Sequence, residues 1–339
     1  MSQNRTVAPL NLHVHTNYSL DGRFSPAQQV RFLDETYRSI AKKRTPKPII
    51  AFTDHENSKA QPEAAKLAKK YGLTVFRGSE YSVNCKDDTG YDHHMHMTVL
   101  FPTDDRRESE RLAERLEDTN RRIEGYRLSL AKETLDALAD QGWSTKYIRN
   151  HEIIDGHTIT KRRIAELLYE DSDNLARIHK MRIKSSDELR KHIVMPNSAL
   201  TRHLLTAQEL IKLVHDFGGH VIVAHPYLPH RPDPYRALIS LMTDRDRELR
   251  VDGVEALYPS VFNGGNSKAS RDLVSLLSAN KTVPVVGSDT HNTKNYATEQ
   301  FIIRKLFESQ DPVVKVISRQ AQAGKGLAVT LNQKLKGRN

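Results

Sequence analysis

The chain of 339 residues contains one cysteine and one tryptophan, and aromatic residues make up only 6% of it. A single cysteine excludes an internal disulfide and is typical of proteins from a reducing compartment. No run of about 18 apolar residues occurs, so the sequence predicts no membrane-spanning helix. The first ten residues lack the apolar stretch of a signal peptide. We therefore expect a cytoplasmic protein.

Two kinds of catalytic motif are also missing from the sequence. It has no Walker loop and no GxGxxG motif, so chemistry driven by nucleoside triphosphates is not indicated. It offers no serine, cysteine or lysine in the setting of an activated nucleophile, and Cys85 is expected to be an ordinary residue. A reaction catalysed by this chain is expected to depend on other groups.

Histidine and carboxylate residues form five short clusters that are spread over almost the whole chain. Most clusters follow an apolar, strand-like run; residues 10–12 precede His13, for example, and residues 283–287 precede Asp289. Neutral imidazole and carboxylate groups are ligands for Zn, Mn and Fe, and side chains at strand ends converge at one mouth of a parallel barrel. The pattern predicts a multinuclear metal site. The clusters are His13-x-His15 with Asp21 behind it, Asp54-His55, Glu80, His96 with His225, and Asp289-x-His291.

Strand-like and helical patterns alternate along the chain. Ser25-Pro26 is a typical start for a helix over 27–43, and Thr206 with Glu209 forms a capping box for a helix over 207–217. Strands that alternate with helices are parallel and have both faces covered. Seven such strands suggest a barrel of seven units. The predicted strands are residues 10–14, 49–52, 74–78, 96–101, 221–224, 254–257 and 284–287.

Residues 104–140 have a different composition. They are dense in arginine and glutamate, and their leucine and isoleucine residues stand at helical spacing. This predicts one long helix or a helical pair that ends at Gly142 and Trp143, followed by shorter helices at 161–170 and 186–192. We therefore expect an α/β fold whose barrel is built from two segments. The predicted divisions are residues 9–101 and 201–310 for the barrel, 102–200 for a helical insertion and 311–339 for a basic C-terminal segment.

The net charge of +10 is unevenly distributed. The predicted insertion holds equal numbers of basic and acidic residues, whereas the chain from Pro312 onward has six basic residues and no acidic one. A basic segment attracts polyanions such as RNA through counterion release. A solvated terminus without a partner is an equally good interpretation. The charge therefore supports a nucleic-acid substrate without establishing it.

Five motifs stand in a fixed order along the chain. They are residues 11–16 (NLHVHT) with 18–22 (YSLDG), 53–55 (TDH), 78–80 (GSE), 224–226 (AHP) and 287–291 (GSDTH). Together they resemble the motifs of the PHP (polymerase and histidinol phosphatase) superfamily. Within it the chain is most similar to the 3′,5′-nucleotide bisphosphate phosphatases and 5′→3′ exoribonucleases of the RNase AM type, which carry a helical insertion between the Glu and AHP motifs. The resemblance implies a distorted (β/α)7 barrel with a helical insertion domain.

The resemblance also implies how the ligands are shared among two or three divalent ions (Mn, Fe or Zn). Glu80 has two oxygens and is suited to bridge two ions. An aspartate at position 21 is a harder ligand than a histidine, which favours Mn or Fe somewhat over Zn. One ion would be held by His13, His15, Glu80 and Asp289, a second by Glu80, His96 and His225, and a third by Asp21, His55 and His291.

Two positions near these ligands have alternatives. His96 opens a predicted strand where the family places its ligand, but His94 stands two residues before it and shares its face of the strand. Either histidine could be the ligand. Asp54 is expected to orient a ligating imidazole or to hold the turn rather than to bind metal itself.

Substrate selection is expected to come from the helical insertion. Residues 157–165 resemble a stretch of the family in which Lys161 replaces an arginine and Arg163 replaces a histidine. Both residues offer positive charge to a phosphate, although lysine lacks the bidentate fork of arginine. A solvated basic helix face is the alternative. The candidate phosphate contacts are Lys161, Arg162 and Arg163, with Arg77 and Lys268 outside the insertion.

The sequence predicts a metal-dependent phosphoric ester hydrolase that uses a metal-activated water, with Glu80, His225 and Asp289 as catalytic residues. The expected substrates are small nucleotides of the 3′,5′-bisphosphonucleotide type, short RNA degraded from its 5′ end, or both. We expect no membrane and no obligate protein partner. A histidinol-phosphate phosphatase is an alternative, and so is a DNA exonuclease or polymerase-associated PHP module. A degenerate module is disfavoured because all nine ligand positions are filled.

Overall fold

The computed structural model describes the chain in segments, which belong to two compact units. The first unit combines Met1–Leu116 with Leu205–Asn339, and the second is Glu117–Leu204. Three candidate site residues, Asp21, Lys268 and His291, lie outside the described residues, as does the basic segment 311–339. The described residues are 10–19, 22–40, 49–90, 92–102, 106–150, 161–193, 204–226, 235–257, 273, 275–277, 279–280 and 282–289.

Seven strands of the first unit form one sheet in chain order. β1, β2 and β3 run parallel to one another, and so do β5, β6 and β7. β4 is antiparallel to both of its neighbours. Each strand overlaps one of the seven predicted runs. The strands are β1 (Leu10–Val14), β2 (Ile49–Phe52), β3 (Thr74–Lys86), β4 (Asp92–Leu100), β5 (His220–Ala224), β6 (Gly253–Leu257) and β7 (Val283–Val286).

The direction of β4 corrects the expectation of seven parallel strands. β3 does not end at Gly78 but continues to Lys86, turns through residues 87–90, and pairs along its second half with β4. Gly90 in this turn has a φ of 82°, a conformation that glycine adopts without strain. After so short a connection the next strand has to return antiparallel, because a parallel strand needs a crossover of about a dozen residues. The alternation of strand and helix is therefore broken between β3 and β4.

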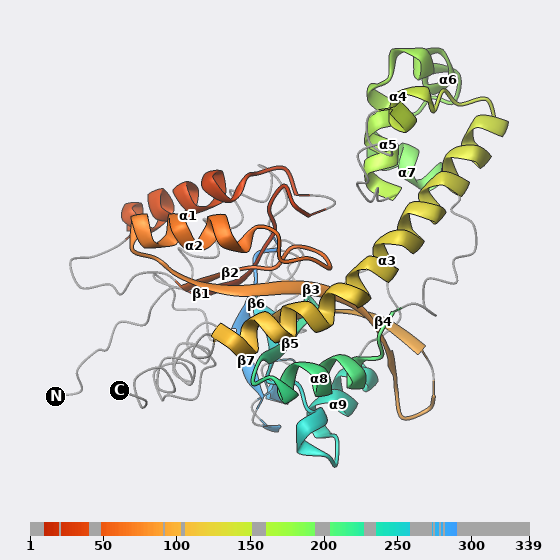
Figure 1. Ribbon diagram of the computed structural model, residues 1–339. Coiled ribbons are helices and arrows are strands. Elements are labelled where there is room, and N and C mark those ends of the chain that lie inside the picture. Colours follow the sequence, from red (N-terminus) through yellow and green to blue (C-terminus); the bar gives the residue numbers. More distant parts are fainter. Residues whose placement is uncertain are drawn as a thin grey trace. The chain divides into compact units, whose positions relative to one another are not determined.

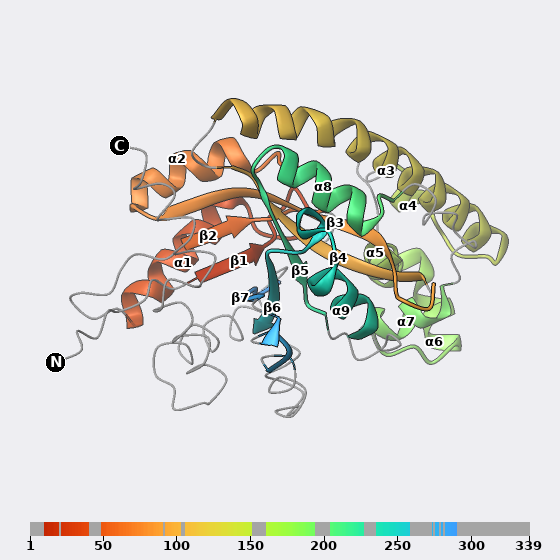
Figure 2. The ribbon, with the colours of Figure 1, turned by 90° about the horizontal axis from the view of Figure 1, so that it is seen from below.

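The sheet curls around an apolar interior. Side chains from six strands meet on its inner face in one buried cluster, which requires the sheet to bend around them. Figure 2 shows this curl along the path from β1 to β7. β1 and β7 come together at the end of the path, where the amide of Asp289 donates to the carbonyl oxygen of His13 at 3.0 Å. The cluster contains Leu12, Ile49, Ala51, Phe76, Leu100, Ile222 and Val285.

Helices cover the outer face of the sheet. α1 and α2 pack against β1 and β2, while α8, α9 and the first turns of α3 pack against β3, β4 and β5 (Figure 1). α8 begins with the predicted capping box of Thr206 and Glu209, which is confirmed. The helices are α1 (Pro26–Ile40), α2 (Gln61–Tyr71), α3 (Arg106–Asp140), α8 (Ala207–Asp216), α9 (Tyr235–Thr243) and a short 3-10 helix at Arg247–Leu249.

The described part of the second unit consists of helices around a core of their own. The second half of α3 enters this core, and the helix ends just before Gly142, whose φ of 83° closes its last turn. The first turns of α3 instead carry Leu112 and Leu116 into the core of the first unit. This is why the second unit begins at Glu117 rather than at the predicted residue 102. The other helices are α4 (Lys146–Ile148), α5 (Lys161–Glu170), a 3-10 turn at Ser172–Asn174, α6 (Leu175–Lys180) and α7 (Ser186–His192).

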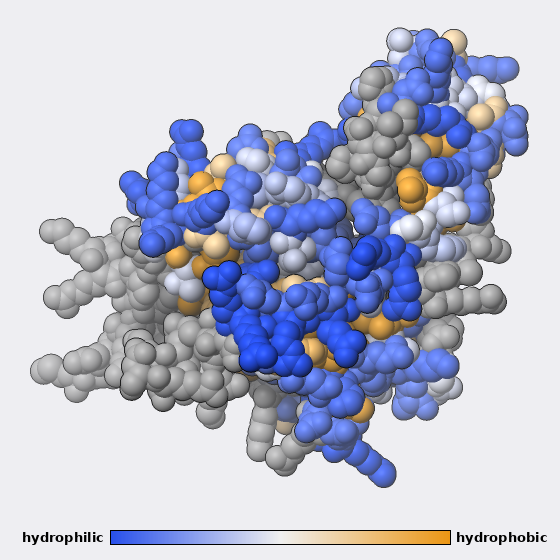
Figure 3. Space-filling model, in the orientation of Figure 1, coloured by the Kyte–Doolittle hydropathy of each residue, from blue (hydrophilic) through white to orange (hydrophobic). Residues whose placement is uncertain are grey.

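The surface of α3 is strongly polar. Arg106 pairs with Glu110 and Arg111 pairs with Glu108, each at 2.7 Å. Figure 3 shows mainly hydrophilic side chains over this helix. None of the described helices is both long and apolar enough to cross a membrane.

Candidate metal centre

A single carboxylate, that of Glu80, lies at the centre of the candidate site. It is completely buried on the inner face of β3, beyond the apolar interior of the sheet. Five imidazole nitrogens lie within 3.2 Å of its two oxygens. Oε2 is 3.2 Å from Nε2 of His13, 3.1 Å from Nε2 of His15 and 3.1 Å from Nδ1 of His55, while Oε1 is 3.0 Å from Nδ1 of His96 and 3.1 Å from Nε2 of His225.

Asp289 completes this group from the loop after β7. Its Oδ1 lies 3.2 Å from Nε2 of His15 and 3.5 Å from Nε2 of His13. Its side chain is 29% exposed, whereas those of the two histidines are fully buried. Asp289 therefore stands on the solvent side of the centre, where water or a substrate can enter.

The strands place these side chains by alternation and by one irregularity. On β4, which runs antiparallel, His96 and Leu100 share the inner face, so His96 reaches the centre from mid-strand rather than from a strand end. The register of β1 shifts between Asn11 and Val14. A bulge of this kind re-aims side chains, and here it allows both Leu12 and His13 to point inward.

The ligand atoms fall into two groups whose members all lie within 4.8 Å of one another. The two groups meet at Glu80, and Nε2 of His13 lies 2.9 Å from Nε2 of His15. Seven of the nine candidate ligands are brought together, and the other two, Asp21 and His291, lie outside the described residues. The groups are His13, Glu80, His225 and Asp289, and His15, His55 and Glu80.

Some atoms of the centre are buried without a hydrogen bond, although nitrogen and oxygen atoms surround them. They include Oε2 of Glu80 and Nδ1 of His96. A buried polar atom that lacks a hydrogen-bond partner is costly, so the arrangement is incomplete as it stands. Imidazole nitrogens around carboxylate oxygens are the donor set that Zn, Mn and Fe prefer. The residues present therefore fit a metal ion.

The carboxylates of the centre favour positive charge on the histidines next to them. Burial opposes protonation of His15, but the carboxylates of Asp289 and Glu80, 3.2 and 3.1 Å from its Nε2, raise its pKa to about 10. Burial likewise opposes protonation of His13, and the carboxylates of Glu255 and Glu80 still raise its pKa well above the usual value. Burial alone would raise the pKa of Glu80, yet the surrounding histidines hold it well below its usual range. A divalent cation would supply the same positive charge.

The two sequence alternatives have clear positions. His96 rather than His94 lies against Glu80, and the two rings meet edge to face with their centroids 5.3 Å apart. Asp54 accepts hydrogen bonds from the amide and the hydroxyl of Thr16, at 2.6 and 2.7 Å. It holds the turn after β1, in line with the predicted role.

Two supporting residues escaped the sequence analysis. The hydroxyl of Ser19 lies 3.0 Å from Nδ1 of His15, and Glu255 of β6 contacts His13 and the backbone of His225. A signal for Glu255 exists in the sequence, because a glutamate interrupts the apolar strand of Gly253–Leu257. A charged residue at the centre of a buried strand indicates a buried polar partner.

Of the predicted phosphate contacts, Arg77 is the one described in the first unit, and it does not join this group. Arg77 lies on the outer face of β3, where its guanidinium donates to the hydroxyl of Ser109 at 3.3 Å and packs over Phe101. Arg162 and Arg163 of α5 both pair with Glu166 within the second unit, at 3.4 and 3.7 Å. A phosphate-binding role for Lys161, Arg162 and Arg163 stays a prediction.

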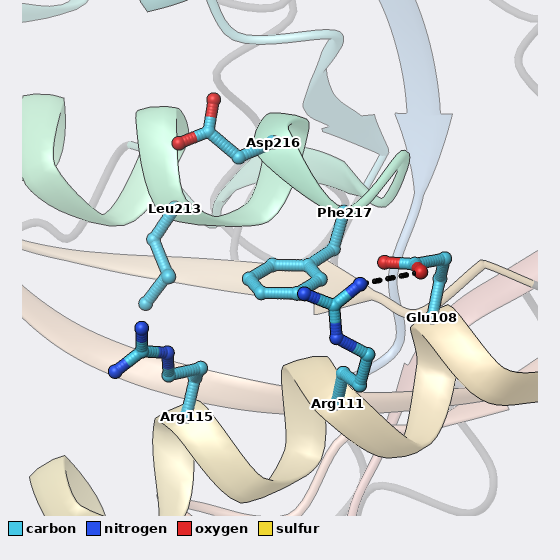
Figure 4. A pocket seen from close by; sticks show the side chains of 6 residues that line it. All are labelled: Glu108, Arg111, Arg115, Leu213, Asp216 and Phe217. Carbon is cyan, nitrogen blue, oxygen red and sulfur yellow. Dashed lines mark hydrogen bonds and ion pairs between the residues drawn. The ribbon is translucent and has the colours of Figure 1, made fainter.

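A groove on the outer face of the first unit is separate from the centre. It lies between α3 and α8 and has a volume of about 470 Å³ (Figure 4). Arg111 packs over the ring of Phe217 at 5.2 Å and pairs with Glu108 across one end of it. None of the candidate ligands lines this groove, so the reaction is not placed there.

The curled sheet with helices on its outer face defines a class of α/β fold that is also found in solved structures. An amidohydrolase from Chromobacterium violaceum, solved with bound sulfate and no metal, is 19% identical, with 93% of this chain and 96% of that chain covered and a TM-score of 0.63. A protein from Bifidobacterium adolescentis that is assigned as a metal-dependent phosphoesterase is also 19% identical, with 84% and 88% covered and a TM-score of 0.56. At this identity the likeness concerns the fold alone.

Sequence comparison gives the family. Residues 11–244 match the PHP domain family, and the chain belongs to it. An uncharacterized protein of Methanocaldococcus jannaschii is 38% identical over 74 residues, which are 21% of this chain and 42% of that protein. This chain therefore matches less than half of that relative's length.

Proposed function

We propose that this chain is a metal-dependent phosphoesterase with two or three divalent ions (Mn, Fe or Zn) at the mouth of its barrel. The observation that carries the proposal is the set of five buried imidazoles around the two oxygens of Glu80. Membership of the PHP family supports it, and so does the fold shared with the protein assigned as a phosphoesterase.

The residues have distinct roles in this proposal. When bound, such ions lower the pKa of a water molecule and neutralise the charge of a phosphate. Glu80 presents its two oxygens to different imidazoles and would bridge two ions. His13, His15 and Asp289 would hold one side of the centre, and His96 with His225 the other. His55 would bind next to His15, together with Asp21 and His291.

No protein nucleophile is needed for this chemistry. The apolar interior of the barrel, including Leu12, Phe76 and Leu100, closes the centre from below and excludes water there. The partly exposed Asp289 leaves the opposite side accessible. A phosphate ester would therefore approach from the side of Asp289, and the attacking group would be a water molecule rather than a side chain.

We propose small nucleotides of the 3′,5′-bisphosphonucleotide type, short RNA, or both as substrates. The net charge of +10 and the basic residues from Pro312 onward support an anionic substrate. On α5, Arg162 and Arg163 already share Glu166, so Lys161 is the stronger candidate for a second phosphate. Arg77 has a different role, because its guanidinium packs against α3.

The test is phosphate release from three substrates assayed side by side with Mn²⁺: a 3′,5′-bisphosphonucleotide, histidinol phosphate and a 5′-phosphorylated oligoribonucleotide. We expect the bisphosphonucleotide or the RNA to be hydrolysed with the highest kcat/KM. In Lys161→Ala, KM should rise more for the bisphosphonucleotide than for a simple aryl phosphate, because only the former has a second charge. A preference for histidinol phosphate would overturn the substrate assignment, and no release from any phosphate ester would overturn the function.

A further inference from the structure

Glu255 lies in the middle of β6 and is completely buried. Its Oε1 is 2.7 Å from Nδ1 of His13, and its Oε2 accepts the backbone N–H of His225 at 2.7 Å. One carboxylate therefore contacts two residues of the candidate centre, one on β1 and one directly after β5. Each of its oxygens makes one of these contacts, so Glu255 acts on the centre through His13 and His225.

The contact with His13 determines which nitrogen of that ring carries a proton. An ionised carboxylate can only accept hydrogen bonds, so Nδ1 of His13 has to donate to Glu255. The lone pair of the neutral ring is then on Nε2, the atom that faces Glu80 and Asp289. An imidazole that donates its other N–H to a carboxylate is a better oriented and more basic ligand.

The contact with His225 supports a strained backbone. His225 has a φ of 27°, which residues with a side chain rarely adopt. This conformation turns the chain sharply at the end of β5 and carries the imidazole to within 3.1 Å of Oε1 of Glu80. The hydrogen bond from its amide to Glu255 holds the residue in that conformation.

Gly287 makes room for this arrangement. Glu255 has to reach from β6 past the end of β7 to His13 on β1, and its carboxylate passes directly over Gly287. A Cβ atom on Gly287 would overlap Oε1 and Cδ of Glu255 and would lie 2.8 Å from Cβ of His13. Its φ does not require a glycine, because it is not among the residues with positive φ. The glycine is therefore needed for space.

We propose that Glu255 is the positioning residue of the centre, because it fixes the Nδ1–H tautomer of His13 and the backbone of His225. Gly287 leaves the space that the carboxylate of Glu255 needs. The inference rests on the proposed metal centre. It predicts a changed tautomer of His13 in Glu255→Gln. If the amide oxygen of glutamine keeps the N–H of His225, its NH2 group faces Nδ1 of His13. Nδ1 then has to accept, and the proton moves to Nε2, where it blocks a metal ion.

The experiment measures the affinity of the folded protein for Zn²⁺ by competition with a chelator, without a turnover assay. We expect Glu255→Gln and Gly287→Ala each to weaken binding by about 10- to 100-fold. Because both changes act through one contact, the double variant should bind about as weakly as the weaker of the two single variants. In the Zn²⁺-loaded wild type, ¹⁵N NMR of histidine should show the proton of His13 on Nδ1.

Asp252→Asn is the matched control, because Asp252 also receives two histidines but lies outside the centre. It should bind Zn²⁺ like the wild type. Three results would each overturn the role of Glu255. They are wild-type Zn²⁺ affinity in Glu255→Gln or in Gly287→Ala, additive losses of affinity in the double variant, and a proton of His13 on Nε2. Because the NMR measurement uses the wild type, it tests the tautomer of His13 even if a variant does not fold. If the wild type itself binds neither Zn²⁺ nor Mn²⁺, the failure is that of the metal centre.

Discussion

Two carboxylates of the first unit receive histidines at opposite ends of β5. At one end Asp252 accepts from His215 and from the amide of Val221, both at 2.8 Å, and lies 3.2 Å from Nδ1 of His220. At the other end Glu80 has five imidazoles around it, and its Oε2 makes no hydrogen bond. Both oxygens of Asp252 are hydrogen-bonded within the protein, whereas Oε1 of Glu80 is hydrogen-bonded to His225 and Oε2 of Glu80 is not hydrogen-bonded.

This difference separates a structural cluster from a functional one. Buried polar groups in a stable fold are paired, as at Asp252, and a buried group that is left unpaired calls for an explanation. Burial would raise the pKa of Asp252, but its hydrogen bonds to the two histidines hold it well below the usual range. The same residue types at Glu80 converge on a few ångströms of space instead. The Asp252 cluster is thus complete without a ligand, and the Glu80 cluster is suited to hold a cation.

The largest expected effect is that of Glu80→Gln. The variant keeps its shape but loses the charge that two ions would share, so hydrolysis should fall by more than about 100-fold, beyond what loss of an outer contact costs. Mn²⁺ should raise the Tm of the wild type by mass action and leave that of the variant almost unchanged. Turnover of at least half the wild-type value at saturating metal would place Glu80 in the same structural class as Asp252.

Asp252→Asn should have the opposite profile. Asparagine cannot accept from all of its present partners, so the free energy of unfolding should fall by about 1–3 kcal/mol. Activity per folded molecule should not change, because the side chain is at the far end of β5. Thermal unfolding and turnover measured on the same samples distinguish the outcomes. A loss of turnover without a loss of stability would contradict the division between the two clusters.

The smallest expected effect is the pH dependence of the stability that His215 contributes. Burial lowers its pKa, but the hydrogen bond to Asp252 and the charge of that residue outweigh burial and raise it. A raised folded pKa contributes stability that is fully present below the unfolded value of about 6.5 and is lost as the pH rises through the folded value. The Tm difference between the wild type and His215→Gln should therefore be larger at pH 6 than at pH 9. An equal difference at both values would show that the neutral ring stabilises the fold equally well.

The positions of the strands could be predicted from the sequence because each has a short apolar run between polar turns. The direction of β4 could not be predicted from strand and helix alternation. Residues 87–90 form a short turn with a glycine, which is a hairpin signal, but the predicted strand over 74–78 stopped too early to use it. The sequence does not show that β3 continues through Glu80, because a charged residue usually marks the end of an apolar run.

The candidate ligands could be predicted as a set but not as a geometry. His13 and His15 are found by their spacing on one strand, and Asp289 by its place after another. Which nitrogen lies against which oxygen depends on the curl of the sheet and on the bulge in β1, neither of which a single sequence specifies. Glu255 shows the same limit, because its partners are 242 and 30 residues away along the chain.

The position of β5 between two histidine clusters limits insertions and deletions in this strand. Its five residues connect His220 of the structural cluster to His225 of the candidate centre, and both side chains depend on the same register. Removing or adding one residue here would turn each later side chain to the other face of the sheet and displace one cluster or the other. We therefore expect insertions and deletions to be tolerated far less in β5 than in surface turns such as residues 87–90.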